Sequence, residues 1–425
     1  RMLAYSVAWG LAGLCEIEER AKFHSGFMQV LEQAGDRDAI PPCREEETIF
    51  EYMPDIEDRQ RHWKLWTPPE WKVPNRLQFS ALLIPTMDSV RAEYIIQTIA
   101  NLPQSRNPPN FASTLMVGTG GTAKTSTALM YLQKLNMDTL FWKRVNFSSA
   151  TTPFGLQRAI EAEVERKTGK TFCPPGGKRL TVFLDDASMP QVNKWGDQVT
   201  NELTRQLVEF NGFYFLEREK RGEFKRVENL QYIAAMAQPG GGRNDVPNRL
   251  KSKFLLFNMV LPSQTSIDDI YGSILRARFQ PKNFADTAII TASRSLTIAT
   301  ISVWNKVQRT LLPTPARFHY VFNMRELSRI FQGIMETPME SITSELSLVG
   351  LWKHECIRVF GDKLARTEDK TFVDKVVQEV VQQTFGDAAA TQCKTTQWWC
   401  DFQREAQIVD DDDEAVAPKV YEPVG

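Results

Sequence analysis

Short apolar runs alternate with amphipathic segments between about residue 115 and residue 261. Apolar runs bounded by turn residues predict buried strands, whereas apolar positions spaced three or four residues apart predict helices. Strands that alternate with helices predict an α/β fold, in which helices cover both faces of a parallel sheet. The predicted strands are 115–117, 140–147, 180–184, 230–237 and 255–261, and the predicted helices are 126–135, 155–166 and 196–208.

The chain on either side of this region has other patterns. Residues 2–31 have the spacing of one or two packed helices, and 33–73 is a linker without regular pattern, expected to dock through its tryptophans. Within the α/β region, 167–178 is expected to be a loop and 212–228 an exposed hairpin. Beyond residue 263 the spacing predicts an all-helical domain, with helices at 266–279, 285–307, 323–335, 346–364 and 372–385.

A glycine-rich turn between the first strand and the first helix is typical of a phosphate-binding loop. Its backbone N–H groups and the following helix N-terminus would point at phosphate oxygens. Lys124 would reach the β- and γ-phosphates, and the Thr125 hydroxyl would bind Mg²⁺. The candidate nucleotide-binding residues are Gly118, Gly120, Gly121, Thr122, Ala123, Lys124, Thr125 and Ser126.

This loop departs from the strict pattern at one position. Ala123 stands where the pattern has glycine before the lysine. Alanine adds only a methyl group, so the turn is expected to survive if its φ angle is negative. A glycine-rich turn that holds no ligand is the alternative interpretation.

A second candidate motif closes the strand at 180–184. Asp185 and Asp186 follow this strand, where nucleotide hydrolases place an acid that holds Mg²⁺ and a neighbour that polarises the attacking water. An Asp-rich turn without function is the alternative. Ile84 and Pro85, upstream of the loop, could contact a nucleotide base or belong to the core, and both interpretations stay open.

Composition narrows the possible partners and compartment. The formal net charge is −1, so nothing points to nucleic acid or to a membrane surface. The six cysteines are scattered without a C-x-x-C pair, which argues against a zinc site or disulfide framework and suits a reducing cytoplasm. The acidic run 410–414 is expected to be a solvated connector. The chain begins at Arg1 without a signal peptide and is interpreted as a piece of a longer protein.

Seven motifs together resemble the third AAA+ module of an axonemal dynein heavy chain. Two segments within them, WGDQVTNE and PGGGRNDVP, most resemble outer-arm heavy chains. The resemblance extends from about residue 75 to residue 385. It implies a P-loop NTPase domain of AAA+ type followed by an all-helical lid. The motifs are IPTMDSVR (84–91), GTGGTAKT (118–125), NFSSATTP (146–153), FLDDASMP (183–190), NKWGDQVTNEL (193–203), AAMAQPGGGRNDVPNRL (234–250) and LPTPARFHYVFNMRELSRIFQG (312–333).

The resemblance also implies a division of the chain. Residues 1–74 would be the end of the preceding module's lid with a linker, and 75–262 the large nucleotide-binding domain. Residues 263–386 would be the small helical lid, and 387–425 an acidic connector to the next module.

Roles carry over by position. Lys124 and Thr125 would be the Walker A pair, and the family also has alanine at the place of Ala123. Asp185 would be the Walker B acid, and Asp186 replaces the usual catalytic glutamate. The remaining roles fall on Arg325 as the sensor-2 arginine, on Arg249 as a finger acting in trans for the preceding module, and on Ala237–Gln238 as the sensor-1 position, where Ala237 lacks a polar group.

The function implied is binding of ATP or ADP with Mg²⁺ and regulation of a ciliary or flagellar motor, with slow or no hydrolysis at this site. An actively hydrolysing site and a structural ring segment with an empty pocket are the alternatives. The implied partners are neighbouring AAA+ modules and dynein intermediate and light chains, with microtubules bound only through the whole motor. The implied location is the axoneme, within the cytoplasm and cytoskeleton. A DNA-remodelling AAA+ protein is not supported, because the chain has no basic stripe.

Overall fold

The computed structural model describes residues 1–425 except 46, 75–76, 80–81, 107–108, 221, 241–242, 396, 405–418 and 425. The predicted acidic run 410–414 therefore lies outside the described residues. The chain divides into two compact units. The α/β unit comprises residues 1–69 and 87–261, and the helical unit comprises residues 70–86 and 262–425.

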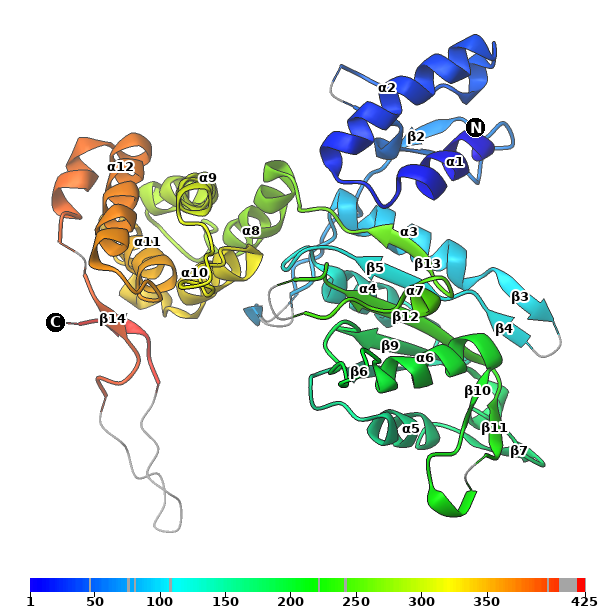
Figure 1. Cartoon of the computed structure of the whole chain (residues 1–425). Coiled ribbons are helices and arrows are strands. Elements are labelled where there is room, and N and C mark those ends of the chain that lie inside the picture. Colours follow the sequence, from blue (N-terminus) through cyan, green and yellow to red (C-terminus); the bar gives the residue numbers. More distant parts are fainter. Residues whose placement is uncertain are drawn as a thin grey trace. The chain divides into compact units, whose positions relative to one another are not determined.

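The α/β unit is built on a five-stranded sheet in which every neighbouring pair is parallel (Figure 1). This confirms the predicted parallel sheet. The carboxyl ends of its strands share one edge, so the residues that follow them are brought together. In spatial order the strands are β13 (Leu255–Asn258), β5 (Thr114–Val117), β12 (Leu230–Met236), β9 (Arg179–Asp185) and β6 (Leu140–Asn146).

Both faces of this sheet are buried under helices, which explains the continuous apolar runs. Successive side chains point to opposite faces. Leu115 and Leu184 therefore belong to one core with α5, α6 and α7, whereas Met116 and Phe183 belong to another with α3 and α4. The helices are α3 (Met87–Ala100), α4 (Lys124–Gln133), α5 (Pro153–Glu161), α6 (Val199–Phe210) and α7 (Asn248–Lys251).

A second sheet lies outside the prediction. The expected helix 155–166 ends at Glu161, and strands at 165–168 and 171–173 occupy its last residues and the first half of the expected loop 167–178. The charged strand β7 pairs antiparallel with β8, and β8 pairs with β11, whose residues lie far downstream, so no local pattern reveals the pairing. The predicted hairpin at 212–228 is confirmed by β10 and β11. The strands are β7 (Glu165–Thr168), β8 (Thr171–Cys173), β10 (Gly212–Tyr214) and β11 (Phe224–Val227), and a separate hairpin is formed by β3 (Pro103–Arg106) and β4 (Pro109–Phe111).

The N-terminal segment of the α/β unit contains the two predicted helices, α1 (Met2–Ala12) and α2 (Ile17–Gln33). The expected irregular linker contains the short antiparallel strands β1 (Tyr52–Pro54) and β2 (Trp63–Leu65). Small residues of α1 pack against Ile49 and Phe50, which are almost fully buried. Of the tryptophans expected to dock this segment, Trp66 is buried and Trp63 is half-buried against the same cluster.

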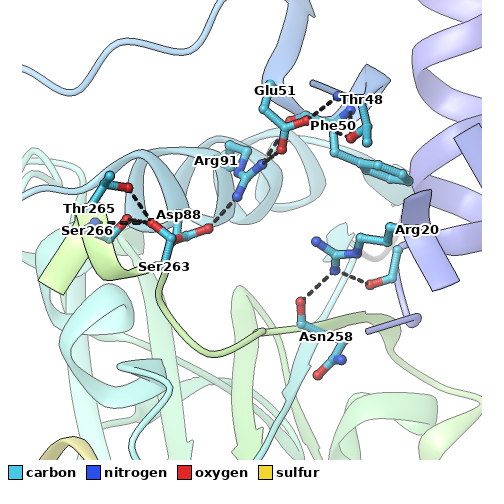
Figure 2. Close-up of polar contacts among 11 residues, drawn as sticks. Arg20, Thr48, Phe50, Glu51, Asp88, Arg91, Asn258, Ser263, Thr265 and Ser266 are labelled. Atoms are coloured by element: carbon cyan, nitrogen blue, oxygen red, sulfur yellow. Dashed lines mark hydrogen bonds and ion pairs between the residues drawn. The ribbon is translucent and has the colours of Figure 1, made fainter. Parts of the chain in front are cut away.

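Two buried arginines join this segment to the rest of the α/β unit (Figure 2). Arg20 donates to the carbonyl oxygens of Gly13 and Asn258, at 2.9 and 3.0 Å. Arg91 pairs with Glu51 at 3.0 Å and also with Asp88 of its own helix. Burial lowers the pKa of Arg20 to about 10, so it stays charged at neutral pH. Charged hydrogen-bond networks of this kind fix the position of packed segments.

The helical unit has all five predicted helices around one core, which includes the fully buried Trp352. A π-helical turn, Ile357–Gly361, extends α11. Within the described residues, no helix is long and apolar enough to cross a bilayer. The elements are α8 (Gln264–Arg278), α9 (Thr287–Thr310), α10 (Met324–Glu336), α11 (Glu345–Cys356), α12 (Thr367–Gln392), and the paired short strands β14 (Trp399–Cys400) and β15 (Glu422–Pro423).

Candidate nucleotide-binding site

The turn between β5 and α4 requires glycine for two different reasons. A Cβ atom on Gly118 would lie 2.5 Å from the carbonyl oxygen of Met259, so only glycine lets the two backbones approach so closely. Gly121 has a φ angle of 89°, in the left-handed region that favours glycine. The loop is therefore a tight turn held against the end of β13.

Ala123 does not have the negative φ angle on which its tolerance was expected to depend. It is the residue before α4, and its φ is 57°, in the left-handed region. The condition is therefore not met, and the turn forms with a left-handed alanine. A left-handed alanine costs roughly 1–2 kcal/mol.

Replacing this alanine by glycine is therefore expected to stabilise the protein. Ala123→Gly relieves the strain, and part of the gain is offset by the greater unfolded-state entropy of glycine, about 0.5–1 kcal/mol. We expect urea unfolding to give a net gain of about 0.5–1 kcal/mol. Ala21→Gly, at an exposed position inside α2, is the control and should lower the free energy of unfolding by about 1 kcal/mol. If Ala123→Gly and Ala21→Gly lowered the free energy of unfolding equally, the backbone of Ala123 would not be strained.

Lys124 lies against the loop that it follows. Its Nζ atom donates to the carbonyl oxygens of Gly118 and Thr119, at 2.9 and 2.7 Å, and contacts the Thr122 hydroxyl at 3.1 Å. The Thr122 hydroxyl donates back to Thr119. One ammonium group is thus placed beside the loop backbone and the first turn of α4, where an anion would be attracted both by the charge and by the N–H groups of a helix N-terminus.

The Walker-type threonine and acid meet in the structure. The Thr125 hydroxyl lies 3.0 Å from one carboxylate oxygen of Asp185, at the end of β9, and the Asp185 side chain is only 8% exposed. A hydroxyl and a carboxylate are ligands that Mg²⁺ prefers. The side chains present therefore fit a Mg²⁺ ion bound together with a phosphate chain.

Sequence reasoning missed Arg144, the third member of this group. Arg144 comes from β6, and its guanidinium lies 2.7 Å from the same Asp185 oxygen that accepts from Thr125. Arg144 could have been found from the sequence by looking for a cation near the carboxyl end of β6, the strand beside β9, which ends in Asp185. However, β6 and β9 are separated by a long connection, so only the tertiary structure shows that they are adjacent strands.

Asp186 differs from Asp185 in its surroundings. It is exposed, and its φ angle is 58°, a conformation that aspartate tolerates better than most residues. Among the residues that the structure describes, none hydrogen-bonds to its carboxylate. It is free to orient a water molecule, but nothing holds it in one position.

Ala237 and Gln238 follow β12, which lies between β5 and β9 in the sheet, whereas Arg249 belongs to α7. Arg249 of α7 is 64% exposed and pairs with Glu202 of α6 at 3.2 Å. Ala237 is buried, and Gln238 donates to Glu16 at 3.4 Å.

Three predicted residues belong to the helical unit. Ile84 packs against the core of that unit, and Pro85 is half-buried. Arg325 is exposed in the first turn of α10, where its N–H donates to the Asn323 side chain. The roles of these three residues in nucleotide binding stay predictions.

Family comparisons cover most of the chain. Residues 71–262 match a family described as the P-loop containing dynein motor region. Residues 296–394 match the AAA+ lid domain, and residues 1–68 match the dynein heavy chain AAA lid domain.

Individual relatives match over nearly the whole chain. The flagellar outer-arm dynein gamma chain of Chlamydomonas reinhardtii is 39% identical over 98% of this chain. Dynein axonemal heavy chain 5 of Mus musculus is 38% identical over 100%, and dynein axonemal heavy chain 8 of Homo sapiens is 37% identical over 99%. The chain spans about 9% of the length of each of these relatives.

Proposed function

Because this chain belongs to the dynein heavy chain family, we propose that it is an AAA+ module that binds ATP or ADP with Mg²⁺ and regulates a ciliary or flagellar motor. The observation that carries the proposal is the contact between Thr125 and Asp185 beside a phosphate-type loop. A structural turn alone would not require these two side chains to meet.

The contacts around the loop support the following proposed roles. Lys124, the loop backbone and the α4 N-terminus bind the phosphates, with Gly120 and Ser126 part of the same stretch. Thr125 and Asp185 hold Mg²⁺, which supplies positive charge to the phosphate chain when it is bound. Ile84 and Pro85 are proposed to contact the base.

Turnover at this site is proposed to be slow or absent. Asp186 is shorter than the usual glutamate by one methylene, and misplacement by about 1 Å can cost ~100-fold in rate. Arg249 is proposed to act in trans for the preceding module, so the corresponding arginine for this site comes from another module. Lack of such an arginine costs about 10³–10⁵-fold.

The module is proposed to act within a larger protein. Residues 75–262 serve as the large domain and 263–386 as the lid, whose Arg325 responds to the third phosphate. Residues 1–74 belong to the preceding module's lid and linker, and 387–425 lead to the next module. The partners are the adjoining modules and dynein intermediate and light chains, with microtubules bound only through the whole motor. The location is the axoneme of cilia and flagella.

The nucleotide retained after incubation with ATP tests this proposal. The 425-residue chain is incubated with ATP and Mg²⁺, freed of unbound nucleotide, denatured, and analysed by ion-exchange chromatography. We expect retained ATP, both in the natural chain and in Asp186→Asn, an isosteric variant that keeps tolerance of the left-handed backbone.

Other outcomes select the alternatives. ADP in the natural chain together with ATP in Asp186→Asn would establish an active hydrolase. No nucleotide in either protein would establish a structural segment and would contradict the proposal.

A further inference from the structure

The register of the strands places Arg144 beside Asp185, the proposed Mg²⁺ ligand. Residues of β6 and β9 pair in parallel, with Arg144 opposite Phe183 and Asn146 opposite Asp185. Paired residues share a face of the sheet, and Phe183 belongs to the core under α3 and α4. Arg144 therefore projects from the same face as α4, the helix that begins at Lys124. Its position follows from the backbone pairing and not from one chosen rotamer.

The next residue supplies an internal comparison. Lys143 points to the opposite face of the sheet, and its Nζ atom pairs with Glu163 at 2.6 Å. The two adjacent cations of β6 are thus separated by the alternation of the strand. Of these two cations, Arg144 is the one on the face of Thr125 and Asp185.

Arg144 brings a permanent charge to Asp185. Arginine side chains carry a positive charge, and the guanidinium of Arg144 contacts Asp185 Oδ2 at 2.7 Å. The Asp185 carboxylate is nearly buried, so screening by water is weak. The carboxylate that would attract Mg²⁺ is therefore already neutralised by a cation that belongs to the chain.

We propose that Arg144 takes over part of the role of Mg²⁺, so that this site holds nucleoside di- or triphosphates with little dependence on the metal. The inference rests on the proposed nucleotide binding. A fixed positive charge attracts the phosphate chain and repels a divalent cation placed near the same carboxylate. Both effects reduce the difference between nucleotide affinity with Mg²⁺ and nucleotide affinity without it.

The test measures nucleotide affinity under two conditions. A fluorescent ADP analogue (mant-ADP) is titrated into the 425-residue chain with excess Mg²⁺ or with EDTA. In the natural chain the two dissociation constants should agree within about threefold. In Arg144→Gln the ratio of the EDTA value to the Mg²⁺ value should rise by about tenfold, and the half-saturating Mg²⁺ concentration should fall.

Three further variants isolate the charge. Lys143→Gln removes the neighbouring cation on the opposite face and should keep the natural ratio. Arg144→Lys keeps the positive charge and should also keep the natural ratio. Arg144→Met removes the charge without adding a polar group and should behave as Arg144→Gln. Circular dichroism spectra check that each variant is folded.

The outcomes separate the two proposals. An unchanged ratio in the folded glutamine or methionine variant overturns the inference, as does an Arg144→Lys variant that behaves like them. No binding by the natural chain under either condition overturns the proposed function and the inference together.

Discussion

Replacement of Lys124 by alanine is expected to weaken nucleotide binding at least ~100-fold. The Nζ atom lies within 2.9 Å of two loop carbonyl oxygens, so the ammonium group is held where phosphates approach the loop. Charged hydrogen bonds contribute roughly 1.5–3 kcal/mol each, and about 1.4 kcal/mol corresponds to tenfold in affinity. Titration of mant-ADP or mant-ATP in the presence of Mg²⁺ measures the effect.

Lys134 offers the matched control for this variant. It lies just beyond the last turn of α4 and pairs on the surface with Glu93. Lys134→Ala removes an equal charge from the far end of the same helix and should leave the affinity within about twofold. If Lys124→Ala bound nucleotide as well as Lys134→Ala, the loop would have no phosphate-binding role.

The second large effect concerns acid stability of the helical unit. His354 is 4% exposed, and neither ring nitrogen has a hydrogen-bond partner among the described residues. Its ring packs against Trp398, with the carboxylate of Glu355 4.0 Å from Nε2. Burial, together with the Arg358 charge, lowers the pKa of His354 from 6.5 to about 4, although Asp362 acts in the opposite direction.

Acidification should therefore destabilise the natural chain through this histidine. Between pH 6.5 and pH 4 the unfolded chain binds a proton that the folded chain does not, so the free energy of unfolding falls as the pH falls. The loss from this group is about 2 kcal/mol at pH 5 relative to pH 7, and it levels off below the folded pKa. Urea-unfolding curves at the two pH values, followed by circular dichroism, measure it.

The pH dependence, and not the absolute stability, identifies the histidine as the cause. His354→Phe removes the titrating group and should show about 2 kcal/mol less loss between pH 7 and pH 5. His319→Phe, at an exposed position of the same unit, should lose as much as the natural chain. If the stability of His354→Phe depended on pH as that of the natural chain does, His354 would not be the cause of the acid destabilisation.

Local patterns located the elements that bury their own side chains. The strands at 140–147 and 180–184 were predicted within one or two residues of β6 and β9. The apolar run of β9 is continuous because almost all of its residues are buried. The five helices of the helical unit were found because their apolar residues recur at helical spacing and pack into one core. Strand β7 was missed because its residues are exposed and mostly charged, and strand β8 because it has only three residues and pairs with the distant β11.

The sequence by itself determined the order along the chain of the five strands of the central sheet, the phosphate-type loop, and the acid at the end of β9, since each depends on residues close together in the chain. Tertiary structure decided the left-handed backbone of Ala123 and the contacts that Asp185 makes with Thr125 and Arg144. The reason is physical: a φ angle is set by where a turn must lead, and an ion pair by which strands become neighbours. Both depend on segments distant in the sequence that pack together only in the folded chain.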